Sequence, residues 1–211
     1  MCNILITRNH CSDSAVVRQS ILDGMFSFRN EVFFQKLGWE VDSKNGFESD
    51  PYDDRDPIYV IAHQEDRVEG CWRFLRTTAP YMLKDTFPEL LRGEAAPCDP
   101  AIWEISRFAV SPEGVSDYRQ FSNHPITLNI LRAGYEFARS RGVRQFVAVT
   151  SVAMERLLKR IGLSMRRFGD GKATRIGKTL SVAVWIDVDE HFRRAVYRGG
   201  KRTDYRMEVA A

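Results

Sequence analysis

The chain contains 211 residues, of which 44% are hydrophobic, and its formal net charge is +3. This length and composition suit one soluble α/β domain or two small ones. The small charge argues against a nucleic-acid-binding regulator, and no apolar run approaches the roughly 20 residues of a membrane span. The first ten residues lack the apolar core of a signal peptide. The four cysteines show no metal-ligand spacing, so we expect free thiols, a cytoplasmic location and no metal.

The first predicted elements are a short strand over residues 2–7 and a long helix over residues 12–37, which Gly38 and Trp39 end. Five residues recur at helical spacing and predict one core-facing stripe: Leu22, Phe26, Arg29, Phe33 and Leu37. Arg29 stands in the middle of this stripe, where an apolar residue is expected. Since a buried lone charge is costly, we expect Arg29 to be paired with carboxylates inside the fold.

An acidic loop is predicted from residue 40 to residue 56. Its second half is rich in acids, namely Glu48, Asp50, Asp53, Asp54 and Asp56. A solvated loop is the simplest interpretation, but arginines that face the core would need partners of this kind. The spacing of the acids could also suggest a calcium loop, yet the EF-hand pattern is absent and calcium is disfavoured.

Residues 58–63 and 68–76 predict a β-hairpin over a turn at residues 65–67. Strict alternation places Cys71, Arg73 and Leu75 on one face of the second strand and Val68, Trp72 and Phe74 on the other. Arg73 is thus a second arginine among apolar side chains, which we expect to meet Asp50, Asp53 or Glu104. Residues 82–91 predict one or two helical turns broken near Pro88.

Residues 101–110 predict a central strand with charged residues among large apolar ones. One face carries Ile102, Glu104, Ser106, Phe108 and Val110, and the other carries Trp103, Ile105, Arg107 and Ala109. Both faces are too apolar for an edge strand, so the charges of Glu104 and Arg107 must be paired. Two interpretations stay open at this point: a structural ion pair, or a strand that serves acid–base chemistry or substrate binding.

The remaining elements alternate between helix and strand. A polar, mobile connection is predicted at residues 111–123, a helix at 125–140, a strand at 144–150, a helix at 152–161 with Ser151 as its N-cap, and a strand at 179–188. The tail after His191 is basic and weakly patterned. This order predicts one α/β domain over residues 1–211, with a mixed central sheet and helices on both faces. No dinucleotide-binding glycine motif, Walker loop or Gly-x-Ser-x-Gly elbow occurs.

Six segments, in order and with matching spacing, carry a family resemblance: residues 29–33, 37–39, 48–53, 70–73, 81–83 and 104–108. They resemble the acyl-homoserine lactone synthases, which make the autoinducers of bacterial quorum sensing. Residues 80–100 look most like the branch that makes long-chain 3-oxo signals. The resemblance implies a fold related to the N-acetyltransferase (GNAT) superfamily. It also implies acyl transfer from acyl carrier protein to the amine of S-adenosylmethionine, followed by lactone closure and release of methylthioadenosine.

The resemblance also implies roles for single residues. Arg29, Phe33 and Trp39 would belong to the part that closes over S-adenosylmethionine. The family's charged cluster would comprise Asp50, Asp53, Arg73, Glu104 and Arg107. We expect Glu104 to take a proton from the attacking amine, with Ser106 and Arg107 as further catalytic candidates. Backbone N–H groups of residues 104–107 could stabilise the oxyanion. No cofactor is implied, because S-adenosylmethionine is a substrate.

The identity of the acyl donor affects two further expectations. The pyrophosphate loop common in coenzyme A-using acetyltransferases is absent before Pro125, which favours acyl carrier protein. Carrier proteins are acidic, so a basic docking face is expected. It could comprise Arg156, Lys159 and Arg160, with Arg166 or Arg167. The alternatives are a solvated helix face and, for the whole chain, an acyl-CoA-dependent N-acyltransferase of the same fold.

The acyl pocket is expected along the strand that ends at Thr150 and at the start of the following helix. Its candidates are Ala148, Thr150, Ser151, Val152 and Met154. Relatives that make 3-oxo signals have threonine at the position of Ala148, and alanine cannot donate a hydrogen bond to a 3-oxo group. We therefore expect an unsubstituted or 3-hydroxy product of medium or long chain length, unless Thr150 or Ser151 supplies the hydroxyl.

Overall fold

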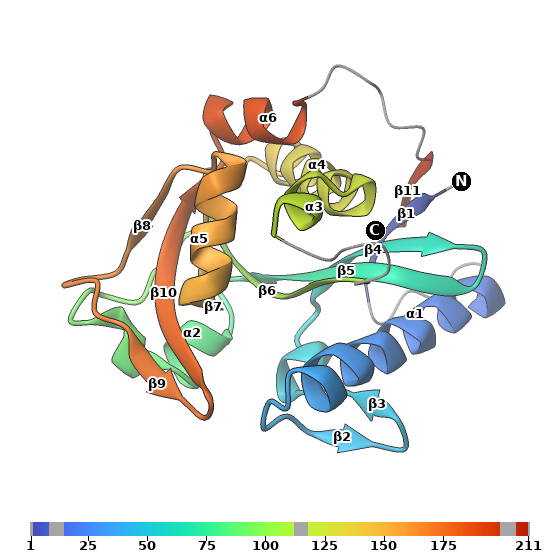
Figure 1. Cartoon of the computed structure of the whole chain (residues 1–211), viewed down its shortest axis with the longest axis horizontal. Coiled ribbons are helices and arrows are strands. Elements are labelled where there is room, and N and C mark those ends of the chain that lie inside the picture. Colours follow the sequence, from blue (N-terminus) through green and yellow to red (C-terminus); the bar gives the residue numbers. More distant parts are fainter. Residues whose placement is uncertain (1, 9–14, 112–117, 199–205, 211) are drawn as a thin grey trace.

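The computed structural model describes residues 2–8, 15–111, 118–198 and 206–210. They form the predicted mixed sheet with helices on both faces (Figure 1). The strands in spatial order are β11 (Arg206–Ala210), β1 (Asn3–Arg8), β4 (Ile58–Gln64), β5 (Arg67–Arg76), β6 (Ile102–Val110), β7 (Gln145–Ser151), β10 (Thr179–Asp187) and β8 (Met165–Arg167), and β9 (Thr174–Ile176) pairs with β10. The β1–β11 and β6–β7 pairs are parallel, and the other pairs are antiparallel.

Helices cover the two faces of the central strands differently (Figure 1). One face is covered by α1 (Ala15–Arg29), and the opposite face by α4 (Pro125–Ser140), α3 (Tyr118–Asn123), α5 (Val152–Ile161) and α6 (Glu190–Val196). Tyr59, Ile61 and Cys71 form part of the core under α1, whereas Trp72, Phe74, Ile130 and Phe146 belong to the core under α4. A third group, which includes Leu75, Val147 and Trp185, lies by α2 (Met82–Asp85) and η3 (Pro88–Leu91).

The parallel strands β6 and β7 separate after a short paired stretch. Their register runs only from Ile102 opposite Gln145 to Glu104 opposite Val147. Beyond these residues the two described strands form no further pairs with each other. The ends of the two strands beyond Glu104 and Val147 are therefore open to partners other than each other.

The predicted N-terminal helix changes from an α-helix to a π-helix before it ends. At Asn30, α1 gives way to a π-helix, η1 (Asn30–Lys36), in which the N–H of Leu37 donates to the carbonyl of Val32 at 2.9 Å. The wider turn rotates later residues out of the α-helical stripe. Phe33 stays buried, but Leu37 is 50% exposed, so its predicted place in the core is wrong. The predicted start at Ser12 lies outside the described residues.

Two irregularities break the strict alternation expected of the strands. A register shift opposite Ala62 and His63 places Val68 in the core under α1 with Cys71, not with Trp72 as predicted. In β6, Arg107 has a left-handed backbone with φ of 54°, beside a register shift between Cys71 and Arg73 of β5. Such a bulge moves the following residues to the opposite face. The prediction that residues 102–110 alternate without interruption is therefore wrong.

Some predicted irregular regions contain secondary structure. The acidic loop contains β2 (Ser43–Lys44), β3 (Phe47–Glu48) and a 3₁₀ turn, η2 (Pro51–Asp54). Residues 118–123 of the predicted polar connection form α3, whereas residues 112–117 lie outside the described residues. The weakly patterned tail includes α6 and β11; a short helix and a largely exposed edge strand give little periodicity to detect. None of the described helices has the length and apolar character required to cross a membrane.

Candidate active site

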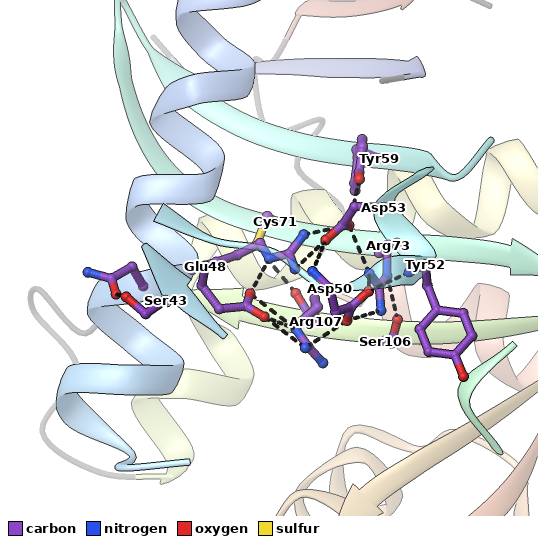
Figure 2. Close-up of polar contacts among 12 residues, drawn as sticks. Ser43, Glu48, Asp50, Tyr52, Asp53, Tyr59, Cys71, Arg73, Ser106 and Arg107 are labelled. Carbon is purple, nitrogen blue, oxygen red and sulfur yellow. Dashed lines mark hydrogen bonds and ion pairs between the residues drawn. The ribbon is translucent and has the colours of Figure 1, made fainter. Parts of the chain in front are cut away.

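Three arginines and three carboxylates meet between α1, the acidic loop and the central strands (Figure 2). The arginines are Arg29 of α1, Arg73 of β5 and Arg107 of β6, and the carboxylates are Glu48 of β3, Asp50, the N-cap of η2, and Asp53 of η2. We call these six residues the charged cluster. Its three positive and three negative formal charges balance, so the group can be buried without a net charge.

Arg29 is fully buried, with 0% of its surface exposed. Its Nε donates to Glu48 at 2.6 Å, and its Nη1 and Nη2 donate to the two oxygens of Asp53 at 2.8 and 2.9 Å. The hydroxyl of buried Tyr59 also donates to Asp53, at 2.7 Å. The predicted pairing of Arg29 inside the fold is confirmed, and part of the acidic loop is its partner.

Arg73 connects the acidic turn to β6. Its guanidinium donates to both oxygens of Asp50 at 2.6 and 2.9 Å, to Asp53 at 2.8 Å and to Ser106 Oγ at 3.0 Å. The sulfur of Met82 lies 3.1 Å from Arg73 Nη2. The predicted pairing of Arg73 with Asp50 or Asp53 is therefore also confirmed.

Arg107 reaches the same cluster from the residue after Ser106. Its Nη2 donates to Glu48 and to Asp50, each at 2.8 Å. Regular alternation would send Ser106 and Arg107 to opposite faces, but the left-handed conformation of Arg107 brings both side chains to one face. Its guanidinium also lies over the Phe33 ring, 5.5 Å from the centroid. Trp39 stacks on Phe33 at 5.1 Å, so these two aromatic candidates adjoin the cluster.

Asp53 and Asp50 are held in their ionised form. Burial alone would raise the pKa of Asp53, but Arg29 and Arg73 outweigh burial and hold it below its usual range. Burial alone would also raise the pKa of Asp50, but the charges of Arg73 and Arg107 outweigh burial and lower it. The acidic turn is itself tightly closed, because Asp50 accepts from the N–H of Tyr52 at 2.9 Å and Asp53 accepts from the N–H of Asp50 at 2.8 Å.

Glu104 was expected in the charged cluster with a paired charge, but it lies beside the cluster and forms no ion pair with any of the described residues. Only 1% of it is exposed, and its carboxylate accepts from the N–H groups of Met82 and Leu83 at 2.8 and 2.6 Å. Burial raises the pKa of Glu104 to about 7, although the two N–H donors and Arg73 act in the opposite direction. A carboxyl group with this pKa can gain or lose a proton near neutral pH, which suits a general base.

The acyl-pocket candidates lie on and after β7. Ala148 is buried opposite Val184 of β10, in the core under α4, and Thr150 is partly buried. The Ser151 hydroxyl accepts from the N–H of Met154 at 3.0 Å, so its predicted N-cap role is confirmed. Val152 and Met154 are partly buried against the same core. Candidates from β7 and α5 therefore lie next to a continuous apolar interior.

The basic candidates on and after α5 fall into two groups. In the first group, Lys159 and Arg167 bind the buried Glu155 at 2.8 and 2.6 Å. The hydrogen bond from Arg167 is the main reason that the pKa of Glu155 is lowered to about 2, and Lys159 lowers it further. Arg166 binds Glu94 at 3.0 Å and lies over Trp185. Arg156 and Arg160 are exposed, and neither has a carboxylate partner within 4.0 Å among the described residues.

Sequence reasoning did not single out two residues that the structure places in this candidate site. Glu48 was noted only as part of the acidic loop, yet it joins Arg29 to Arg107. Met82 was not considered, although its backbone binds Glu104 and its sulfur contacts Arg73. Both residues lie in the segments that carry the family resemblance. That position was the available signal, because charge pattern alone does not distinguish Glu48 from its solvated neighbours.

Comparisons with known proteins show the family of this chain. A family model described as autoinducer synthase matches residues 13–196. A curated acyl-homoserine-lactone synthase of Aliivibrio fischeri is 41% identical over 186 residues, which cover 88% of this chain and 95% of that protein. The crystal structure of the AHL synthase LasI is 37% identical, with a TM-score of 0.80 over 93% of this chain and 95% of that chain.

More distant structures show the fold alone. BjaI, a CoA-dependent acyl-homoserine lactone synthase solved with SAM and isopentyl-CoA, is 23% identical, with a TM-score of 0.84 over 100% of this chain and 95% of that chain. A protein described as an N-acetyltransferase, from Lactobacillus plantarum, is 14% identical, with a TM-score of 0.57 over 89% of this chain and 99% of that chain. The predicted GNAT-like architecture is thereby confirmed.

Proposed function

The chain belongs to the autoinducer synthase family of acyl-homoserine-lactone synthases and is an acyltransferase, and from this premise we propose its substrates. It transfers a medium- or long-chain acyl group from acyl carrier protein to the amine of S-adenosylmethionine in the cytoplasm. Lactone closure then releases methylthioadenosine. The observation that carries this proposal is the charge-balanced cluster beside Glu104, at the point where β6 and β7 separate.

The charged cluster supports S-adenosylmethionine as the amine substrate. Arg29, Glu48 and Asp53 are buried and hold the frame of the site. Asp50 and Arg107 keep 13% and 7% of their side chains exposed, and they are therefore the charges that a substrate can reach. Asp50 suits the ammonium and sulfonium groups of S-adenosylmethionine, and Arg107 suits its carboxylate. BjaI, which shares the fold, was solved with SAM.

Glu104 is the proposed proton acceptor. Its two oxygens each accept one N–H and keep further lone pairs, so it can take the proton of the amine directly or through water. The amine nitrogen then bonds to the thioester carbonyl carbon, and the carbon–sulfur bond of the donor breaks. Backbone N–H groups of β6 at the point where it separates from β7 are the candidates for stabilising the oxyanion.

Lactone closure needs conformational control more than a further catalyst. A carboxylate oxygen of the acylated product attacks the γ-carbon, and the bond from that carbon to the sulfonium sulfur breaks. Both electrons leave with sulfur as methylthioadenosine, which is a good leaving group. The proposed reaction requires no cofactor, since S-adenosylmethionine is consumed as a substrate.

Acyl carrier protein is the proposed donor, although BjaI is CoA-dependent. Two features of this chain support the carrier: the lack of a pyrophosphate-loop motif before Pro125 and the exposed pair Arg156 and Arg160. The experiment compares one acyl chain presented on carrier protein and on coenzyme A to the purified protein. We expect a kcat/KM at least tenfold higher for the carrier-bound chain. A higher kcat/KM for the coenzyme A thioester would contradict this assignment and identify acyl-CoA as the donor.

A further inference from the structure

Tyr52 joins the acidic turn to the opposite side of the site. It belongs to η2, and its ring lies at the edge of the charged cluster, 5.9 Å from the Arg73 guanidinium, with its hydroxyl pointing away from the ion pairs (Figure 2). The same side chain packs against the third core group, which includes Leu75, Tyr81 and Val147. Tyr52 therefore connects the charged cluster to the core group that includes Val147 of β7.

The hydroxyl of Tyr52 makes a polar bridge. It lies 2.7 Å from Thr86 Oγ1, and either hydroxyl can donate. Among the described residues, this is the one hydrogen bond between the acidic loop at residues 40–56 and the segment at residues 77–100. Thr86 is the C-cap of α2, and the first N–H groups of α2 bind Glu104. The short helix is thus held by Glu104 at one end and by Tyr52 at the other.

The surroundings of Tyr52 are acidic. Burial is the main reason that the pKa of Tyr52 is raised, and the nearby charges of Asp85, Glu104 and Asp50 raise it further. Tyr52 therefore remains a neutral hydroxyl and cannot serve as a base at neutral pH. The hydroxyl therefore lies near Asp50 and Glu104, the two carboxylates that the proposed function assigns to the cationic amine substrate.

We propose that Tyr52 and Thr86 are a positioning pair for the cationic amine substrate. Their hydrogen bond holds the acidic turn against α2, and so sets the separation between Asp50 on one side and Glu104 on the other. The pair acts through these two carboxylates and not on the reacting atoms. The inference rests on the proposed function, because it assigns the pair to the binding of S-adenosylmethionine.

The experiment uses Tyr52→Phe, which keeps the ring but removes the bridge, Thr86→Val, which removes the other hydroxyl, and the double variant. The full-length proteins are assayed for methylthioadenosine release. A neutral hydrogen bond of this kind corresponds to about a two- to tenfold change. We expect each single variant to raise the KM for S-adenosylmethionine by that factor and to leave the KM for the acyl donor unchanged. The double variant should resemble either single one, because all three lose the same bond.

Tyr197→Phe is the matched control. It removes the hydroxyl that donates to Glu136 near α6, far from the acidic turn in the sequence, and should change neither KM. An unchanged KM for S-adenosylmethionine in both single variants, equal rises for both substrates, or additive losses in the double variant would each overturn the inference. A wild-type protein that releases no methylthioadenosine would instead refute the proposed function, so the two failures are distinguishable.

Discussion

Arg29 of α1 and Asp53 of η2 form a two-bond ion pair closed to solvent, with contacts of 2.8 and 2.9 Å. The third guanidinium nitrogen of Arg29 binds Glu48, so one side chain attaches both β3 and η2 of the acidic loop to the N-terminal helix. This frame consists of bonds between the protein's own side chains. It leaves Asp50 and Arg107 at the accessible edge of the cluster. The buried half of the cluster therefore holds in place the half that we propose binds the substrate.

Loss of the Arg29 side-chain charge should destabilise the whole fold. Arg29→Met leaves Glu48 and Asp53 buried with one positive charge fewer beside them. This should reduce the free energy of unfolding by about 3–5 kcal/mol. Denaturant unfolding followed by circular dichroism measures this loss. Arg193→Met is the control, because Arg193 pairs with Glu190 on the surface and its removal should leave the unfolding free energy nearly unchanged. Equal, small effects in both variants would contradict the proposed frame.

Glu104→Gln should lower kcat roughly 10²-fold, the usual effect of losing a general base. In the wild type, activity should rise with pH through about 7 as Glu104 loses its proton, and this limb should vanish in the variant. Initial rates from pH 5.5 to 8.5 measure the effect. A glutamine variant with normal turnover at matched pH would remove Glu104 from the mechanism.

The same pKa has a consequence for stability. Burial raises the pKa of Glu104 in the folded protein from 4.5 to about 7, so the folded state binds this proton more tightly than the unfolded state. The resulting stabilisation is present below about pH 4.5 and is lost as the pH rises through about 7. Unfolding free energies at pH 5 and pH 8 should therefore differ less in Glu104→Gln than in the wild type. An identical pH dependence in the two proteins would show that Glu104 is already ionised when folded.

Charge reversal at Arg156 and Arg160 should weaken carrier docking. The double variant Arg156→Glu and Arg160→Glu should raise the KM for acyl carrier protein at least several-fold and leave that for S-adenosylmethionine unchanged. The control variant Arg139→Glu in α4 with Arg144→Glu just before β7 makes the same change in net charge and should have little effect. If both double variants weaken carrier binding equally, overall charge and not a docking face is responsible.

Ala148 should influence which acyl chain is preferred. A threonine there could donate to a 3-oxo group, and such a hydrogen bond contributes about 0.5–1.5 kcal/mol. Ala148→Thr should therefore increase the 3-oxo share of the products about two- to tenfold, as measured by mass spectrometry of lactones made from mixed donors. Ala148→Ser, with the same hydroxyl and less bulk, should change the products in the same direction. A wild-type product dominated by a 3-oxo lactone would show that Ala148 does not govern the choice.

Sequence patterns predicted most of the fold because long, two-sided strands and amphipathic helices have clear periods. They also identified Arg29 and Arg73, since a charge inside an apolar stripe must have a partner. The patterns were wrong where the backbone leaves its regular period. The π-helix after Arg29 exposes Leu37, and the left-handed Arg107 brings its side chain to the face of Ser106. Such local irregularities do not follow from the linear pattern of apolar and polar residues.

The most direct measurement of the central claim is the ratio of the two products. Purified wild-type protein, given S-adenosylmethionine and an acyl carrier protein that carries a medium-length saturated chain, should release methylthioadenosine and acyl-homoserine lactone in equal amounts, as quantified by liquid chromatography and mass spectrometry. Asp50→Asn, which removes the accessible carboxylate of the cluster, should reduce both products together. Formation of an open-chain N-acyl product without methylthioadenosine would contradict lactone synthesis and identify an ordinary N-acyltransferase.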